Sequence, residues 1–501
     1  MKKRAYISVF DKENIVEFAR ELVEKQNFEI VSTGGTFKLL KENNIEVIEV
    51  SEVTGYPEML HGKVKSLHPE IFAGILADMT NSKEAAEIQL NGVKTFDMVV
   101  VNLYPFEEVA QKTDNIDELI KNIDIGGVSL LRAGAKNHKN ITVICDKADY
   151  KRAINANEET RQELAVKVLT ATSNYDKIIS SKLGEIFGSV ETKNLSFKKL
   201  QELRYGENPH QKAGLYATGK EVDYEILWGK ELSYNNILDI TTAVNIVSEF
   251  YDVPAVAIIK HLAPCGVALG KDSLEAYQKA FDCDPISAFG GIVAFSKGVD
   301  EKTAKLLNSV FLEVVVAPEF DEKALEILQG KKNLRIIKLN TSLADYKKIA
   351  NEEIKITPFG VLIQEADKKE LDKDAFKVVT KVKPTAEQIE DAIFAWKIAK
   401  HAKSNAIVIA KDFKTLAIGQ GQTNRVGAFE WALNYACDAS KDAVAASDGF
   451  FPAVDNIQAA AQGRISLLIQ PGGSIKDNDV IAEADKYKIA MITTGIRHFR
   501  H

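Results

Sequence analysis

Short apolar runs alternate with helical patterns along the chain, and this alternation limits the possible folds more than any other feature. In the first part the runs lie at 5–10, 28–31, 45–50, 98–102 and 141–145, with helical patterns between them, the first of which has Asp11 as a candidate N-cap for a helix at 13–25. Apolar runs of this length are typical of strands rather than independent helices. Strands interleaved with helices form a parallel sheet covered on both sides. The sequence therefore predicts an α/β fold.

The second part of the chain is again α/β. Its predicted strands are at 255–259, 291–295, 314–317, 334–338, 406–410, 416–419, 465–469 and 490–494. The polar, aperiodic segment 184–199 predicts a connection between two domains, at 1–190 and 191–501. A length of 501 residues is also too great for one core.

One internal echo occurs in the second part. Residues 255–270 and 406–421 align without a gap, and each has an apolar run, a lysine, a turn, a second apolar stretch and a glycine. Their identity is low, so a duplicated subdomain is a hypothesis at this point.

Charge and cysteine content exclude several classes of protein. The net charge of −7 gives no basic footprint, which argues against nucleic acid as the main partner. The four cysteines stand far apart without a CxxC pair, which favours reduced thiols and argues against structural zinc. The N-terminal apolar run is too short for a signal peptide, and no window has the length of a membrane span. The sequence therefore predicts a cytoplasmic protein.

The end of the apolar run Ala255–Ile259 is the first candidate for chemistry. Lys260 and His261 follow it directly, and Pro264 and Gly266 predict a turn. Ligands bind beyond the carboxyl ends of strands in open α/β sheets, so these side chains are placed where chemistry can occur. The lysine next to His261 favours a neutral imidazole, the form that a general base needs. The structural alternative is a histidine that caps the turn and a lysine that extends to water.

Polar clusters in the first part stand at strand ends and helix starts. The turn 32–36 (STGGT) lies between a strand and a helix, where glycines and helix N-terminal amides hold phosphate. The loop 61–69 holds two lysines and two histidines, 102–106 (NLYPF) follows a buried strand, and 124–127 opens the helix that carries Lys136. Taken alone, a tight turn and a solvated loop explain the first two equally well. Together the clusters predict a nucleotide-phosphate pocket.

Polar motifs also border the strands of the second part. RYGENPHQ (204–211) follows the connection, and QGQTNRV (420–426) follows a predicted strand. SDGFFPAVDN (447–456) leads into a short helix. The tail 497–501 (RHFRH) has two arginines and two histidines. Such an end is usually disordered, but this one follows an apolar strand directly, so docking is the alternative.

Zinc-deaminase chemistry is excluded by spacing. His68 and Glu70 fit the first half of that signature, and Pro264 with Cys265 begins the second half. The two halves are far apart in the sequence, and position 268 holds Ala where the second cysteine is required.

With these segments assembled, the chain resembles the bifunctional AICAR formyltransferase/IMP cyclohydrolase family from end to end (AICAR is phosphoribosylaminoimidazolecarboxamide). The segments that carry the resemblance occur in this order: STGGT, KVKSLHP, NLYPF, DIGGVSLLRAGAKNH, RYGENPHQ, IIKHLAPCG, SNAIVIA, SDGFFPAVDN and RHFRH. The resemblance implies an N-terminal cyclohydrolase domain of methylglyoxal-synthase-like type. It also implies a C-terminal transformylase of two cytidine-deaminase-like subdomains, and a homodimer whose transformylase sites draw on both subunits.

For formyl transfer, the resemblance implies that the 5-amino group of AICAR attacks the formyl carbon of 10-formyltetrahydrofolate, without a metal. This amine is a weak nucleophile, so it needs a base, and the oxyanion that forms needs a cation. His261 is implied as the base and Lys260 as the cation. The residues implied to hold AICAR are Arg204, Tyr205, Gly290, Glu313, Asn405, Arg425, Phe450, Arg497 and His501. Those implied to line the folate site are Val426, Asp455, Ser474 and Ile475.

For ring closure, the resemblance implies that the carboxamide nitrogen of formyl-AICAR attacks its own formyl group, and water leaves. The reaction is intramolecular, so positioning supplies much of the acceleration and no cofactor is needed. Proton transfer is assigned to Lys136, with Lys65, Tyr104 and Asp124 orienting the reacting groups. The residues implied to bind the nucleotide are Asp11, Lys12, Thr33, Gly34, Gly35, Thr36, Lys63, Ser66 and Asn102.

Three positions depart from some relatives. Phe10 stands where some have Ser, which removes one polar contact. Ser66 stands where some have Thr and keeps the hydroxyl, whereas Glu313 stands where some have Asp and changes the reach to substrate.

Two other functions remain open from the sequence. One is a folate-independent enzyme with a single live domain, and the other is a non-catalytic nucleotide-binding protein. Lys136, Lys260, His261 and Asn405 together favour the enzyme with two activities, because a pure binder needs phosphate contacts but no base.

Overall fold

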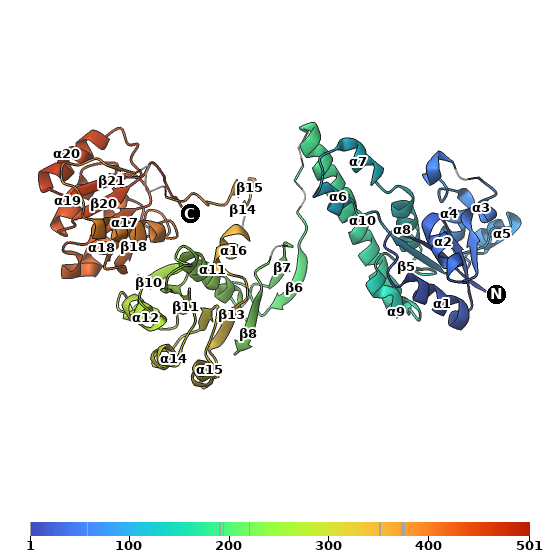
Figure 1. Cartoon of the computed structure of the whole chain (residues 1–501), viewed down its shortest axis with the longest axis horizontal. Coiled ribbons are helices and arrows are strands. Elements are labelled where there is room, and N and C mark those ends of the chain that lie inside the picture. Colours follow the sequence, from blue (N-terminus) through green and yellow to red (C-terminus); the bar gives the residue numbers. More distant parts are fainter. Residues whose placement is uncertain are drawn as a thin grey trace. The chain divides into compact units, whose positions relative to one another are not determined.

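The computed structural model describes residues 2–57, 59–189, 192–193, 195–219, 221–349, 352–371 and 376–501. The chain forms two compact units, unit 1 (Met1–Ser196, blue to green in Figure 1) and unit 2 (Phe197–His501, green to red). The predicted domain boundary, between 190 and 191, lies outside the described residues. Each unit has hydrophobic cores of its own.

Unit 1 is built on a five-stranded parallel sheet, as the sequence predicts, in the order β3-β2-β1-β4-β5. The chain moves outwards from β1 to β3 and then returns to place β4 on the other side of β1. The carboxyl ends of β1 and β4 therefore form a topological switch point, where ligands bind in open α/β sheets. The strands are β1 (Lys3–Val9), β2 (Phe28–Ser32), β3 (Val47–Glu49), β4 (Met98–Asn102) and β5 (Thr142–Ile144).

Helices cover both faces of this sheet. Ala5 and Ile7 of β1 join one core, whereas Tyr6 between them joins the other. A strand that is buried on both faces needs apolar residues at successive positions, which explains the continuous run in the sequence. The helices are α1 (Ile15–Gln26), α2 (Gly34–Glu42), α3 (Val50–Thr54), η1 (Leu60–Gly62), α4 (Pro69–Leu76), α5 (Ser82–Leu90), α6 (Phe106–Ala110), α7 (Ile116–Lys121), α8 (Gly126–Lys136), η2 (Lys147–Asp149), α9 (Tyr150–Ala153) and α10 (Glu158–Phe187).

Two local predictions for unit 1 are wrong. Asp11 does not cap the first helix: α1 begins at Ile15, and the Asp11 carboxylate accepts the backbone N–H of Glu13. The predicted connection at 184–199 begins too early, because α10 continues through Gly184 to Phe187. Strong helix formers on both sides of this glycine outweigh its low helix propensity.

Unit 2 contains a twelve-stranded mixed sheet in the order β16-β21-β20-β19-β17-β18-β10-β9-β11-β12-β13-β8. Two short hairpins, β6–β7 and β14–β15, form separate two-stranded sheets. The strands are β6 (Lys198–Leu203), β7 (Ala213–Ala217), β8 (Tyr224–Trp228), β9 (Ala255–Lys260), β10 (Ala263–Leu269), β11 (Ile292–Phe295), β12 (Val314–Ala317), β13 (Arg335–Leu339), β14 (Glu352–Thr357), β15 (Gly360–Glu365), β16 (Lys377–Val378), β17 (Ile407–Lys411), β18 (Lys414–Gly419), β19 (Val444–Ser447), β20 (Leu467–Gln470) and β21 (Ala490–Thr493).

The large sheet consists of two halves that meet where Ala268 of β10 pairs with Lys414 of β18. Helices α11 and α17 contribute to the same core cluster on one face of it. Within the described residues, no helix combines the length and apolar character that a membrane span requires. The helices of unit 2 are α11 (Tyr234–Ser248), α12 (Ser273–Phe281), α13 (Pro285–Ala288), α14 (Glu301–Asn308), α15 (Glu322–Gln329), α16 (Leu343–Ile349), α17 (Ala386–Ala399), α18 (Arg425–Ala436), η3 (Cys437–Ser440), α19 (Asp455–Gln462) and α20 (Asp477–Tyr487).

The predicted turn at Pro264 and Gly266 is wrong, because both residues lie inside β10. The chain turns earlier, at 261–262, since Lys260 already pairs with Ala263. A bulge between Pro264 and Gly266 interrupts the register. Gly266 serves close packing: a Cβ there would lie 1.9 Å from the carbonyl oxygen of Ala280.

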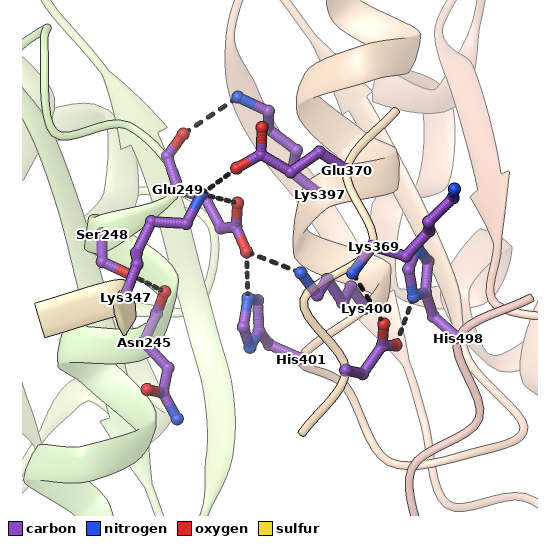
Figure 2. A network of polar contacts seen from close by, with 11 residues as sticks. Asn245, Ser248, Glu249, Lys347, Lys369, Glu370, Lys397, Lys400, His401 and His498 are labelled. Atoms are coloured by element: carbon purple, nitrogen blue, oxygen red, sulfur yellow. Dashed lines mark hydrogen bonds and ion pairs between the residues drawn. The ribbon is translucent and has the colours of Figure 1, made fainter. Parts of the chain in front are cut away.

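A buried charge cluster joins the two halves of unit 2 (Figure 2). The Glu249 carboxylate, after the end of α11, lies 3.1 Å from the ammonium groups of Lys347 and Lys400 and from His401 Nε2. Burial opposes its ionisation, but the hydrogen bond with His401 and the nearby positive charges outweigh burial and hold the pKa of Glu249 well below its usual value. Removing one of these partners would leave a buried charge uncompensated, which is costly.

Candidate functional site

In unit 1, the side chain of Asn102 ties together the two strand ends at the switch point. Its Oδ1 accepts the backbone N–H groups of Phe10 and Asp11, the latter at 3.0 Å, and its Nδ2 donates to the Asp11 carbonyl at 2.9 Å. The ring of Phe10 meets Tyr104 edge to face at 5.6 Å. Asn102 therefore fixes the floor of the site, and Phe10 supplies an apolar contact at its position.

Two lysines lie against the glycines that begin α2. A Cβ on Gly34 would lie 2.6 Å from Lys65 Nζ, and one on Gly35 would lie 3.6 Å from Lys12 Nζ. Gly34 has a φ of 53°, which favours glycine. Backbone amides at the start of a nine-residue helix, together with two ammonium groups, form a suitable environment for a phosphate. The structure thus brings together the glycine turn and lysines from two other segments.

Asp124 lies beside the same loops. Its Oδ1 accepts the N–H of Gly127 at 2.7 Å, and its own N–H donates to the Tyr175 hydroxyl at 2.9 Å. Burial raises the pKa of Asp124. Burial, and then the negative charge of Asp124, raise the pKa of Tyr104. A carboxyl group that keeps its proton at higher pH than usual is suited to proton transfer.

Ser66 is held from beneath by a buried tyrosine. The hydroxyls of Ser66 and Tyr6 are 2.5 Å apart, and Tyr6 is fully buried in the middle of β1. Burial raises the pKa of Tyr6 to about 12, so the phenol stays protonated. A Cβ on Gly126, the first residue of α8, would lie 3.9 Å from the Ser66 Cβ. Ser66 is therefore placed between β1 and the start of α8.

Not every predicted residue of unit 1 joins this group. Lys136 is the last residue of α8, whereas Asp124 precedes its first residue, and a helix of 11 residues is about 16 Å long. Lys136 lines a separate cavity of about 360 Å³ with Phe72, Leu76 and Leu169. Lys63 is exposed, and the hydroxyl of Thr36 is bonded to the backbone of Val9. Thr33 is a buried N-cap without a side-chain cap bond.

In unit 2, the first group of candidate residues lies at the carboxyl end of β9. His261 is exposed in the turn after Lys260, whose ammonium donates to the Phe289 carbonyl at 2.7 Å. Gly290 and Glu313 precede β11 and β12, which pair in register with β9 and with each other, so they lie at the same edge. The Glu313 carboxylate accepts from Arg335 at 2.8 Å. Arg335 therefore pairs with Glu313, the residue that stands where some relatives have Asp.

The second group surrounds Arg425, the first residue of α18. Its guanidinium is buried, pairs with the buried carboxylate of Asp448 and donates to Asn405 Oδ1 at 2.8 Å. The ring of Phe499 lies 5.9 Å from this guanidinium and 4.4 Å from that of Arg497. The C-terminal tail is thus docked against the sheet.

Both groups lie at the same edge of the large sheet. β18 runs antiparallel to β10, so its carboxyl end, which leads to Arg425, points the same way as the turn at His261. The pairing Ala268–Lys414 is near the opposite edge. Among the described residues, no hydrogen bond or ion pair joins the first group to the second.

The other predicted residues of unit 2 are more peripheral. Arg204 stacks on Tyr205 at 4.8 Å and donates to its hydroxyl. Lys355 of the β14–β15 hairpin donates to the carbonyl of His501. The remaining residues follow strand ends at this edge, either exposed or half-buried: Val426, Phe450, Asp455, Ser474 and Ile475.

Comparison with known proteins gives a consistent result over the whole chain. The model of the AICARFT/IMPCHase bienzyme family matches residues 134–435, and that of the MGS-like domain matches 14–129. The bifunctional purine biosynthesis protein PurH of Bacillus mycoides is 47% identical over 516 aligned residues that cover 100% of both chains. PurH of Bacillus cereus strain Q1 is 48% identical with the same coverage. The chain belongs to the AICARFT/IMPCHase bienzyme family.

A solved structure, titled crystal structure of ForH, also matches, with 26% identity over 38% of this chain and 100% of its own, and a TM-score of 0.33. For this member of the AICARFT/IMPCHase family, the resemblance seen in its motifs and the methylglyoxal-synthase-like type of the N-terminal domain are confirmed.

Four residues next to the predicted sites were not predicted from the sequence. Tyr6 and Tyr175 support Ser66 and Asp124, and Asp448 holds Arg425. Asp239 accepts the backbone N–H of Leu262 at 2.7 Å, in the turn that carries His261. Asp448 lies inside the SDGFFPAVDN motif, so the sequence contains a signal that could have identified it. The other three belong to strands or helices with no motif of their own.

Proposed function

We propose that unit 1 closes the purine ring and that unit 2 transfers the formyl group, in domains that correspond to 1–190 and 191–501. The chain is a bifunctional AICAR formyltransferase and IMP cyclohydrolase of the final steps of IMP synthesis. The observation that carries the division of labour is that each unit has its own group of candidate residues at a sheet edge. The formyl donor in this proposal is 10-formyltetrahydrofolate, a co-substrate.

In unit 2, His261 takes the proton from the 5-amino group of AICAR as its nitrogen attacks the formyl carbon. The exposed imidazole at the end of β9 supports this role, because a base must reach the bound substrate. Lys260 supplies the positive charge for the oxyanion. AICAR is held by Arg425 and Asn405, with Arg204, Tyr205, Gly290, Glu313, Phe450, Arg497 and His501. The folate binds along Val426, Asp455, Ser474 and Ile475.

In unit 1, the phosphate of formyl-AICAR binds at the start of α2, between Lys12 and Lys65. The proximity of both ammonium groups to Gly34 and Gly35 supports this placement. Tyr104 and Asp124 then face the reacting groups, where a carboxyl group with a raised pKa can move a proton. Because the attack is intramolecular, orientation contributes more than any single catalytic group. The part of Lys136 in proton transfer stays a prediction.

The proposed assembly is a homodimer whose unit 2 consists of two cytidine-deaminase-like subdomains. The hairpin β14–β15 supports dimerisation, because its Ile356 is 85% and its Phe359 102% exposed, which is unfavourable for apolar side chains in water. The repetition of a helix and a following hairpin in each half, α11 with β9–β10 and α17 with β17–β18, supports the subdomain pair.

The test is an assay of the purified protein with AICAR and 10-formyltetrahydrofolate, in which tetrahydrofolate and IMP are followed separately. Equal amounts of both products are expected at steady state. Tetrahydrofolate without IMP would contradict ring closure by unit 1. If neither product formed, the whole proposal would be contradicted.

A further inference from the structure

The turn that carries His261 has an unusual backbone for its sequence. Lys260 pairs with Ala263, so His261 and Leu262 form a two-residue hairpin loop. Their φ angles are 55° and 64°, both left-handed. Two positive φ angles define a type I′ turn, which favours Asn-Gly and similar pairs. His and Leu disfavour this conformation, so something else must hold the turn in place.

The carboxylate of Asp239 is the group that holds it. Asp239 Oδ1 accepts the N–H of Leu262 at 2.7 Å, and the carboxylate also interacts with the backbone N–H of His261. Asp239 is the sixth residue of α11, a helix whose start is fixed by a capping box at Ser233. The rigid helix therefore fixes the carboxylate, and the carboxylate fixes the turn.

The other half of unit 2 contains the same device. Asp412 and Phe413, between β17 and β18, have φ angles of 53° and 54°. Their N–H groups donate to the two oxygens of Asp391 at 2.9 and 2.8 Å. Asp391 is the sixth residue of α17, which also begins with a capping box. The arrangement is thus a repeated structural element, and only the copy at Asp239 presents an imidazole.

We propose that Asp239 is a positioning residue for formyl transfer: it locks the type I′ turn that aims the His261 imidazole away from the end of β9. The proposal rests on the proposed role of His261 as the base. Asp239 need not exchange a proton with substrate. Its effect is geometric, and small errors in the position of a catalytic group are costly in rate.

The matched control is Asp391, which holds a turn of the same type without a proposed base. Asp239→Ala is expected to lower kcat for formyl transfer about 10- to 100-fold, with KM for AICAR within about twofold and cyclisation of supplied formyl-AICAR unchanged. Asp391→Ala and Asp239→Ala are expected to lower the thermal midpoint of unfolding by similar amounts, but Asp391→Ala should keep the wild-type kcat. An equal loss of kcat in both variants, or none in Asp239→Ala, would overturn the proposal.

Two further variants separate positioning from general destabilisation. Asp239→Asn keeps one acceptor oxygen and should recover part of the lost kcat. Leu262→Gly, added to Asp239→Ala, makes the left-handed turn easier to adopt and should also recover part of it. No recovery with either change would contradict positioning through the turn. If His261→Ala itself kept normal formyl transfer, the proposed role of His261 as the base would fail. This result distinguishes a failure of the proposed function from a failure of positioning by Asp239.

Discussion

The two units gather their candidate residues in different ways. In unit 1, parallel strands place every loop that follows a strand at one edge, and the group forms at the switch point between β1 and β4. In unit 2, the two halves join through antiparallel strands, so the hairpin end of one half and the opposite end of the other share an edge. The mixed sheet of unit 2 thus places two separate polar groups at one edge without a hydrogen bond between them.

The largest expected effect separates the two sites. His261→Ala should reduce formyl transfer by about 10²–10⁴-fold, because the attacking amine loses its base. Cyclisation of supplied formyl-AICAR should stay at the wild-type rate. The measurement is the initial rate of each reaction in the same preparation. Loss of both activities in a folded variant would contradict two separate sites.

Two variants identify which residue of unit 1 transfers the proton. Asp124→Asn should slow cyclisation by about 10²-fold or more, because the amide cannot move a proton. Lys136→Ala tests the residue at the far end of α8. If Lys136 carries the proton, IMP formation stops and formyl-AICAR accumulates. IMP formation at the normal rate would instead assign proton transfer to the group around Asp124.

The next prediction concerns the buried charge cluster around Glu249, which joins the two halves of unit 2. Glu249→Gln should lower the stability of this unit by about 3–5 kcal/mol, because Lys347 and Lys400 lose a buried partner. Unit 1 should be unaffected. All three tryptophans, Trp228, Trp396 and Trp431, belong to unit 2, so urea unfolding followed by tryptophan fluorescence reports on this unit alone. An unchanged midpoint would show that the cluster does not hold the halves together.

The difference in stability between the wild type and Glu249→Gln depends on pH in a defined way. The pKa of Glu249 is lowered in the folded protein, so its stabilisation is complete above the unfolded value of about 4.3 and is lost as the pH falls through the folded value. The difference between wild type and Glu249→Gln should therefore be constant from pH 7 to 5 and shrink below about pH 4. A difference that grew on acidification would have the wrong sign.

The smallest effect tests the support beneath Ser66. Tyr6→Phe removes one hydroxyl from a fully buried pair and should lower the stability of unit 1 by about 1–3 kcal/mol, because Ser66 is left without its partner. Amide hydrogen exchange in β1 and β4 measures the loss. The tryptophan signal of unit 2 is the internal control and should not change.

Continuous apolar runs made most strands predictable. Residues 5–7 of β1 and 255–259 of β9 are buried and apolar at every position, so the signal does not depend on periodicity. β10 was missed because Pro264 and Gly266 usually mark turns, and only the packing of Gly266 against Ala280 explains their place in a strand. Local residue preferences cannot report such a distant contact.

The candidate sites were predictable only in part, for a related reason. Motif residues such as His261 and Asn405 stand next to strand ends that the sequence shows. Asp239 acts on backbone N–H groups 22 and 23 positions away, and nothing in its own neighbourhood marks that contact. The helix that separates Lys136 from Asp124 was visible in the sequence, whereas the cavity that Lys136 lines with Phe72 and Leu169 depends on contacts between distant segments.

The most direct test of two separate sites is a mixture of two single-site variants. His261→Ala and Asp124→Asn are combined in equal amounts with AICAR and 10-formyltetrahydrofolate, and formyl-AICAR and IMP are followed over time. We predict that formyl-AICAR appears first and is then converted to IMP, although neither variant alone makes IMP at an appreciable rate. A mixture that forms no IMP would contradict the assignment of one complete reaction to each unit.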